Sequence, residues 1–283
     1  MMKKQTTLIA LSIATSLMVA GCSQKTEETS KVQKDKNVVE KIKLDTEINS
    51  YRDFVVSQTE EFVKSTQLFV NAINAGDIEE AKRLYPISRS YFERIEPVAE
   101  SFGDLDPKID AREGDVPAEE WTGFHKIEQV LWVDKTTKGL EKYTKQLMTD
   151  ANYLRAKVET VEIDPVLFVT GPVELLNEVS SSKVTGEEER YSHTDLADFA
   201  ANVEGSHKVI ELVLPKLKEQ DAELATTIDN RFNELMASLD SYKNGEQYID
   251  YTKLKEDEVK KLAQQVDALA EPISQVGSTL GVN

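Results

Sequence analysis

The chain has 283 residues, of which 40% are hydrophobic and 30% are charged, proportions that are ordinary for a globular protein with a substantial core. Its 34 basic and 51 acidic residues give a formal charge of −17, which argues against nucleic acid as a partner because phosphate binding needs clustered Lys and Arg. An acidic chain is compatible with cations as ligands, although acidity often serves solubility alone.

The first 21 residues predict a secretory signal peptide. Lys3 and Lys4 form a basic start, an apolar run too short for a stable membrane span follows, and small residues precede Cys22. The sequence Val-Ala-Gly-Cys at 19–22 resembles the bacterial lipobox, in which the cysteine is diacylated and becomes the mature N-terminus. We therefore expect a lipid on Cys22 to hold the protein on the outer face of the bacterial cell membrane, the alternative being a leader followed by an incidental thiol.

Residues 22–45 predict a flexible tether. They are polar, charged and nearly free of aromatic side chains, so they cannot bury enough apolar surface to fold alone. A helical domain is expected over residues 46–283, because apolar side chains recur there at spacings of three, four and seven.

The periodic pattern predicts seven to nine helices. We expect them over residues 47–75, 77–84, 88–102, 118–132, 137–161, 165–179, 192–215, 216–241 and 252–280. Pro86 should break the second helix, Pro97 should kink or end the third, and Pro215 could interrupt the long one. The stretch 103–117 predicts a loop, and 167–169 is the one short β-favouring run. The predicted fold is all-α, a helix bundle.

The first candidate site is the pair His125 and Glu128. Three residues apart on a helix, they project from nearly the same face, so an imidazole and a carboxylate can reach one ion. Carboxylate-bridged metal bundles place Glu and His at such spacing. Judged by spacing alone, a satisfied core histidine among apolar neighbours is the simpler interpretation.

Two other stretches are dense in carboxylates. Glu93 and Glu96 have the same helical spacing, and composition alone favours a solvated face with Arg94 in surface ion pairs. Three consecutive glutamates at 187–189 precede an apparent helix start at 192–195, where a Ser and an Asp could act only as caps.

Other chemistry finds little support in the sequence. The one cysteine is the lipidation candidate, and no Gly-x-Ser-x-Gly, His-Glu-x-x-His or glycine-rich phosphate loop occurs. With histidines only at 125, 193 and 207, carboxylates must dominate any metal site. Oxygen ligands suit hard cations such as Fe³⁺, Mn²⁺ and Ca²⁺.

Several motifs in order resemble those of the EfeO/EfeM family of exported iron-uptake proteins. They are FGDLDPKIDAR at 102–112, GFHKIE at 123–128, TGEEERYSHTDL at 185–196 and NVEG at 202–205. The resemblance covers residues 47–281 and implies an imelysin-like fold of two four-helix-bundle-like halves around a central cleft. Imelysin-like domains were once classed as peptidases because of a Gly-x-His-x-x-Glu motif. Some members begin with a cupredoxin domain; here the tether runs straight into the helices, so this is the short form and a ferroxidase role is doubtful.

The resemblance also implies metal ligands. The matching residues are His125, Glu128, Glu93, Glu96, Asp110 and Glu188. Glu188 is the second glutamate after Gly186, and Glu187 or Glu189 could take its place. We expect the four carboxylates other than Glu128 to converge on a hard cation, with His125 and Glu128 in a second or adjoining site.

The function implied is capture of iron, as Fe²⁺ or Fe³⁺, and its delivery to an EfeU-type permease beside the haem peroxidase EfeB. Cu²⁺ and Zn²⁺ are further candidate ligands. The alternative is a zinc metallopeptidase in which His125, Glu128 and another acid hold the ion and activate its water. Catalytic zinc usually takes three protein ligands and only one histidine is placed for it, so we expect no enzyme. A surface adhesin without a ligand would leave the clustered acids unexplained.

Overall fold

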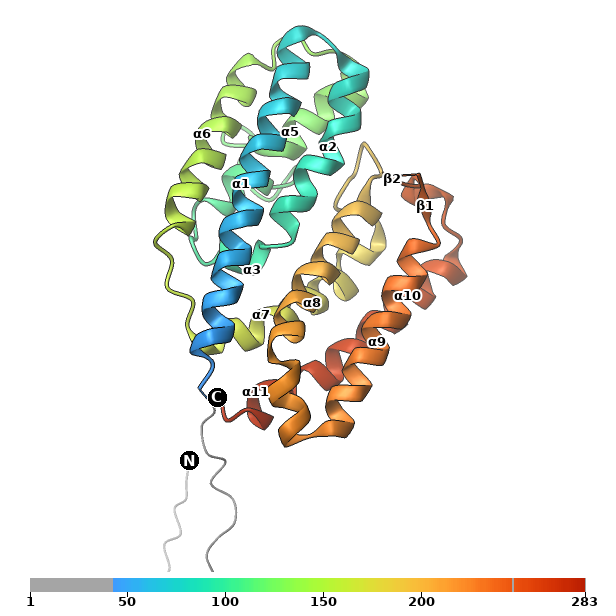
Figure 1. Cartoon of the computed structure of the whole chain (residues 1–283). Coiled ribbons are helices and arrows are strands. Elements are labelled where there is room, and N and C mark those ends of the chain that lie inside the picture. Colours follow the sequence, from blue (N-terminus) through green and yellow to red (C-terminus); the bar gives the residue numbers. More distant parts are fainter. Residues whose placement is uncertain (1–42, 246, 283) are drawn as a thin grey trace, which may run out of the picture. The chain divides into compact units, whose positions relative to one another are not determined.

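The longest helix, α1 (Asp45–Ala75), carries apolar side chains at spacings of three and four, and it packs along α2 (Ile78–Glu93) and α6 (Glu141–Val158). It ends at Gly76, whose φ of 78° lies in the left-handed region that glycine adopts without strain. In Figure 1 this helix runs between α6 and α2.

The computed structural model describes residues 43–245 and 247–282. The predicted signal peptide, Cys22 and the tether up to residue 42 lie outside the described residues. Among the described helices, none combines the length and the apolar character that crossing a membrane requires.

The long helices gather in two groups, as Figure 1 shows. The first group consists of α1, α2, α5 (Gly123–Gln129) and α6, and the second consists of α7 (Pro165–Ser181), α8 (Asp195–Gln220), α9 (Ala222–Asp240) and α10 (Glu256–Ile273). The groups meet where α2 packs on α8 and where α3 (Glu96–Glu100) packs on α7. The predicted all-α fold with two four-helix halves is confirmed.

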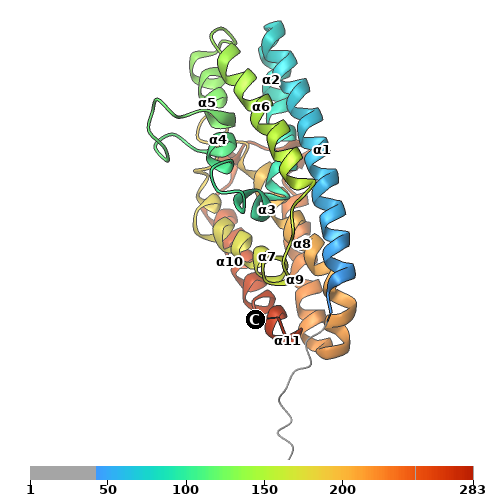
Figure 2. The same cartoon turned by 90° about the vertical axis from the view of Figure 1, so that its left-hand side faces the viewer.

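Short elements connect the helices. They are α4 (Asp106–Asp110), the π-helix η1 (Val130–Asp134), the 3₁₀ turns η2 (Lys183–Thr185) and η3 (Tyr251–Lys253), a hairpin of β1 (Lys243–Asn244) with β2 (Gln247–Tyr248), and α11 (Val276–Thr279). Figure 2 shows the loop between α4 and α5 projecting from the helices. Both α4 and η2 position side chains of the site described below.

The prolines divide the helices differently from the prediction. Pro86 and Pro215 lie inside α2 and α8, which continue through them, so the predicted break at Pro86 is wrong. A proline inside a helix costs roughly 3 kcal/mol, and burial of α2 against α1 and α8 outweighs that cost. Pro97, by contrast, lies in the first turn of α3, where its missing N–H is harmless. The helical path is interrupted between α2 and α3, just before this proline, as predicted.

Two boundaries near the site also differ from the prediction. The predicted loop at 103–117 contains the short helix α4, and the helix expected from residue 118 begins at Gly123. The β-favouring run at 167–169 is helical, because Asp164 caps α7 by accepting hydrogen bonds from the backbone N–H groups of Val166 and Leu167.

Candidate metal centre

The contact between α4 and α5 brings Asp110 next to His125. A Cβ atom on Gly123 would lie 2.2 Å from the backbone oxygen of Ile109, and the φ of 79° at Gly123 is left-handed, so only glycine allows this approach. Phe124 anchors the same turn, with its ring 5.7 Å from that of Phe69. The Gly-Phe-His sequence therefore sets the position of the imidazole.

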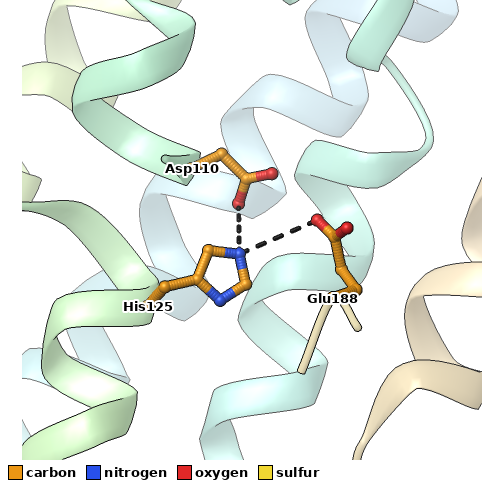
Figure 3. A group of neighbouring side chains, drawn as sticks. All are labelled: Asp110, His125 and Glu188. Carbon is orange, nitrogen blue, oxygen red and sulfur yellow. Dashed lines mark ion pairs between the residues drawn. The ribbon is translucent and has the colours of Figure 1, made fainter. Parts of the chain in front are cut away.

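Asp110, His125 and Glu188 form one of three candidate groups of metal-binding side chains among the described residues (Figure 3). Nε2 of His125 lies 3.5 Å from Oδ1 of Asp110 and 3.7 Å from Oε1 of Glu188. His125 is 1% exposed and Glu188 is 3% exposed. Nε2 makes no hydrogen bond with any described residue. A buried nitrogen that faces two carboxylates without a partner is costly unless a ligand completes the site.

Glu128 holds the other side of the imidazole ring. Its Oε2 lies 3.3 Å from Nδ1 of His125, and its Oε1 accepts hydrogen bonds from the backbone N–H groups of Tyr191 and Ser192 at 3.0 and 2.7 Å. A carboxylate on Nδ1 draws a proton to that nitrogen and leaves the Nε2 lone pair for a metal. Glu189 also approaches Nδ1, at 4.0 Å, so His125, Glu128 and Glu189 form a second candidate group.

Arg89 of α2, which the sequence reasoning missed, lies buried among the acidic side chains. Its guanidinium contacts Glu93 at 2.6 Å and Asp198 at 3.1 Å, and it also contacts Asp110 and Glu189. A buried guanidinium requires such pairing because burial removes its hydration. The spacing of Arg89 four residues before Glu93 was the one sequence signal for this contact.

Lys183 brings Glu93 and Glu96 together. Its Nζ lies 2.8 Å from Oε2 of each glutamate, and Nδ2 of Asn202 donates to the same two oxygens at 3.0 and 2.9 Å. Both glutamates are buried, so the interpretation as a solvated face is wrong. Arg94 points elsewhere and pairs with Glu204 of α8 at 2.6 Å. Nothing in the sequence around Lys183 indicates this role.

The three consecutive glutamates differ in exposure. Glu187 is exposed, whereas Glu188 and Glu189 are buried within the cluster. Glu188 contacts His125 and also accepts a hydrogen bond from Arg112 at 2.9 Å. Glu188 is therefore the glutamate placed beside both His125 and Asp110, as its match to the family motif implies.

The surrounding charges shift the pKa values of His125 and Glu188. Burial and the Arg89 charge would lower the pKa of His125, but the nearby carboxylates of Glu128, Glu188 and Asp110 outweigh them and raise it to about 9. Burial alone would raise the pKa of Glu188, yet Lys183 and His125 hold it well below its usual value. Near neutral pH the metal-free site therefore carries a proton on His125, which a metal ion must displace.

Other carboxyl groups in the cluster shift the opposite way. Burial raises the pKa values of Glu96, Glu189 and Asp198 well above the usual range, and it raises that of Asp110 as well. The buried cations do not neutralise all of these acids, so the cluster takes up protons. A bound cation would supply that missing charge.

A pocket of about 220 Å³ connects this cluster to solvent. Asp110 and Glu188 form part of its wall, together with acidic residues of α3, α4 and α7. Glu96, Glu100 and Glu178 form a further acidic group there, and burial raises the pKa of Asp106 to about 7. The pocket offers a cation an acidic approach to Asp110 and Glu188.

Comparisons with known proteins agree with the motifs. Residues 47–276 match the model of the imelysin family. A protein of Staphylococcus haemolyticus (strain JCSC1435), named Efem/EfeO family lipoprotein, is 43% identical over 97% of this chain and 98% of its own length. A protein of the same name from Staphylococcus aureus (strain NCTC 8325 / PS 47) is 46% identical over 86% of this chain and 87% of its own length. The chain therefore belongs to the imelysin family. Its relatives place it among the Efem/EfeO proteins of that family, as the motifs predicted.

Proposed function

We propose that this chain captures iron at Asp110, His125 and Glu188. The observation that carries the proposal is the buried Nε2 of His125, which has no hydrogen-bond partner among residues 43–245 and 247–282 and faces two carboxylates at 3.5 and 3.7 Å. One imidazole nitrogen with carboxylate oxygens suits Fe²⁺ and Fe³⁺, and it can also accept Cu²⁺ or Zn²⁺. Glu128 orients the imidazole. Glu93 and Glu96 lie in the same cluster, where Lys183 and Asn202 contact both carboxylates.

The same proposal places the protein outside the cell on a lipid anchor. The lipobox-like sequence ending at Cys22 supports it, and the relatives are named as lipoproteins. The iron would pass to an EfeU-type permease, beside an EfeB-like haem peroxidase, as in the uptake system to which the family resemblance points. Cys22→Ala should release a folded domain into the medium, and retention of the variant in the membrane would contradict the anchor.

Metal titration of the full chain in detergent tests the binding step. Fe²⁺ without oxygen, Fe³⁺ offered as citrate, Cu²⁺ and Zn²⁺ would be titrated separately, with heat and bound metal both measured. We expect saturable iron binding that His125→Gln weakens strongly. Equal iron binding by the wild type and His125→Gln would contradict the proposed site.

Peptide hydrolysis tests the alternative, a zinc metallopeptidase. In the described part of the chain, no second histidine joins the candidate metal groups, and zinc peptidases usually have more than one histidine ligand. Zinc-loaded protein should leave unstructured peptides intact. Cleavage that His125→Ala abolishes would favour the peptidase.

A further inference from the structure

We propose that Lys183 acts as a built-in cation that fills the Glu93–Glu96 carboxylate pair and thereby limits the cluster to one metal ion. This inference rests on the proposed function, in which that ion binds at Asp110, His125 and Glu188. It assigns Lys183 the role of setting metal capacity, without contact to the metal.

The ammonium group stands where a second metal ion would need to stand. Nζ lies 2.8 Å from both Glu93 and Glu96, at hydrogen-bond distance, and the side chain of Lys183 is 2% exposed. A metal ion would need the same oxygens at about 2.0–2.6 Å, and both cations cannot occupy one position. Asn202 donates to the same carboxylates, so two side chains of the protein already occupy the space between them.

The fold holds Lys183 in place. It begins the turn η2, and the hydroxyl of Tyr251 donates to the backbone oxygen of the next residue, Val184. At the end of that turn Gly186 has a φ of 77°, and a Cβ atom there would lie 2.7 Å from the Tyr251 ring. Since Tyr251 holds the turn from one side and Val184 is itself buried, the ammonium has little freedom to leave the carboxylates.

The same turn leads directly to the proposed iron ligand. Glu188 follows η2 by three residues, and its Oε1 lies 4.0 Å from Nζ of Lys183 as well as 3.7 Å from Nε2 of His125. The positive charge therefore stands between the two carboxylate groups. The ammonium neutralises the Glu93–Glu96 pair and repels a second cation from it. Asp110 and Glu188, with His125, stay available to the metal ion.

Counting bound iron in variants of the full chain tests this inference. With Fe²⁺ under anaerobic conditions and equilibrium dialysis in detergent, the wild type should bind one ion and Lys183→Met should bind two. Lys183→Arg keeps the charge and should bind one. Lys208→Met removes a half-buried lysine that pairs with Glu211 on α8, away from the cluster, so it controls for net charge and should also bind one.

The outcomes separate the two proposals. One ion in both the wild type and Lys183→Met would overturn the role of Lys183 and leave the proposed function standing. Two ions in the wild type would also overturn that role. No ion in any variant would overturn both proposals. A Lys183→Met/Glu96→Gln variant, which removes one charge of each sign, should bind one ion, and two ions there would show that the extra site lies elsewhere.

Amine labelling of the wild type decides the question if Lys183→Met does not fold. A water-soluble acetylating reagent followed by mass spectrometry should leave Lys183 unmodified with and without Fe²⁺, while Lys208 is acetylated in both. A rise in Lys183 acetylation when Fe²⁺ is added would show that the metal displaces the ammonium. That result would overturn the inference.

Discussion

Two neighbouring groups of acids in this protein differ in the group that lies between their carboxylates. Glu93 and Glu96 receive the ammonium of Lys183 and the amide of Asn202, all from the chain itself. Asp110 and Glu188 face a histidine nitrogen that has no hydrogen-bond partner in the described part of the chain. Similar carboxylate clusters therefore serve different ends. One stabilises the junction between the helix groups, and the other is left for a ligand.

The largest expected effect comes from removing Arg89, which contacts acids of both groups. Arg89→Met should lower the free energy of unfolding by roughly 3–5 kcal/mol, because it leaves buried carboxylates without their charge partner. Arg94→Met is the control, since Arg94 is part exposed and its ion pair is with Glu204. Urea unfolding followed by circular dichroism measures the free energy of unfolding of both variants. Equal losses would show that the buried ion pairs of Arg89 stabilise the fold no more than the part-exposed pair of Arg94.

The next effect concerns the group proposed for iron. Asp110→Asn combined with Glu188→Gln should weaken Fe²⁺ binding by on the order of 100-fold or more, because two proposed ligands are lost, and far-ultraviolet circular dichroism should check that the variant folds. Asp150→Asn in α6 removes a buried acid outside all three candidate metal groups and should bind iron like the wild type. Unchanged Fe²⁺ affinity in the double variant would contradict the assignment of iron to Asp110 and Glu188 and not to Glu93 and Glu96.

A smaller effect is expected from pH. The pKa of His125 rises from 6.5 to about 9 in the folded protein, so its contribution to stability is fully present below pH 6.5 and is lost as pH rises through about 9. The metal-free protein should lose on the order of 2 kcal/mol over that range, and His125→Gln should lose less. Unfolding midpoints in urea from pH 6 to 9.5 measure this. A metal-free protein that gained stability toward pH 9 would contradict the prediction that His125 is protonated in the folded state.

The same proton gives iron binding the opposite dependence on pH. A metal at Nε2 must displace the proton of His125, so Fe²⁺ affinity should rise as pH increases from 6 to 8. Calorimetric titrations in buffers of different ionisation enthalpy would count the proton released. Binding without proton release would argue against an imidazole ligand.

The smallest expected effect is that of Glu128→Gln. Gln keeps the shape and can still accept from the backbone N–H groups of Tyr191 and Ser192, but it loses the charge beside Nδ1. Iron affinity should fall about 10-fold, as expected for a group that orients a ligand. A loss as large as that of the Asp110/Glu188 double variant would instead make Glu128 a direct ligand.

The fold and part of the candidate site could be predicted from the amino-acid sequence. Periodic apolar side chains predicted the all-α fold, and the described part of the chain has seven helices of 16 to 31 residues. Local motifs pointed to Asp110, His125 and Glu188, because Gly123 and the residues around it determine how α4 meets α5. These features depend on short stretches of chain, where spacing and backbone conformation decide the outcome.

Only the tertiary structure decided which charges meet. Lys183 is separated from Glu93 by 90 positions and Asp198 from Arg89 by 109, so no local pattern connects them. Packing of α2 on α8 and the turn before Glu188 bring them together, and the same packing carries α2 through Pro86. Burial then makes each unpaired charge costly, and that cost, which depends on the whole fold, determines where a cation is already supplied and where a ligand is still needed.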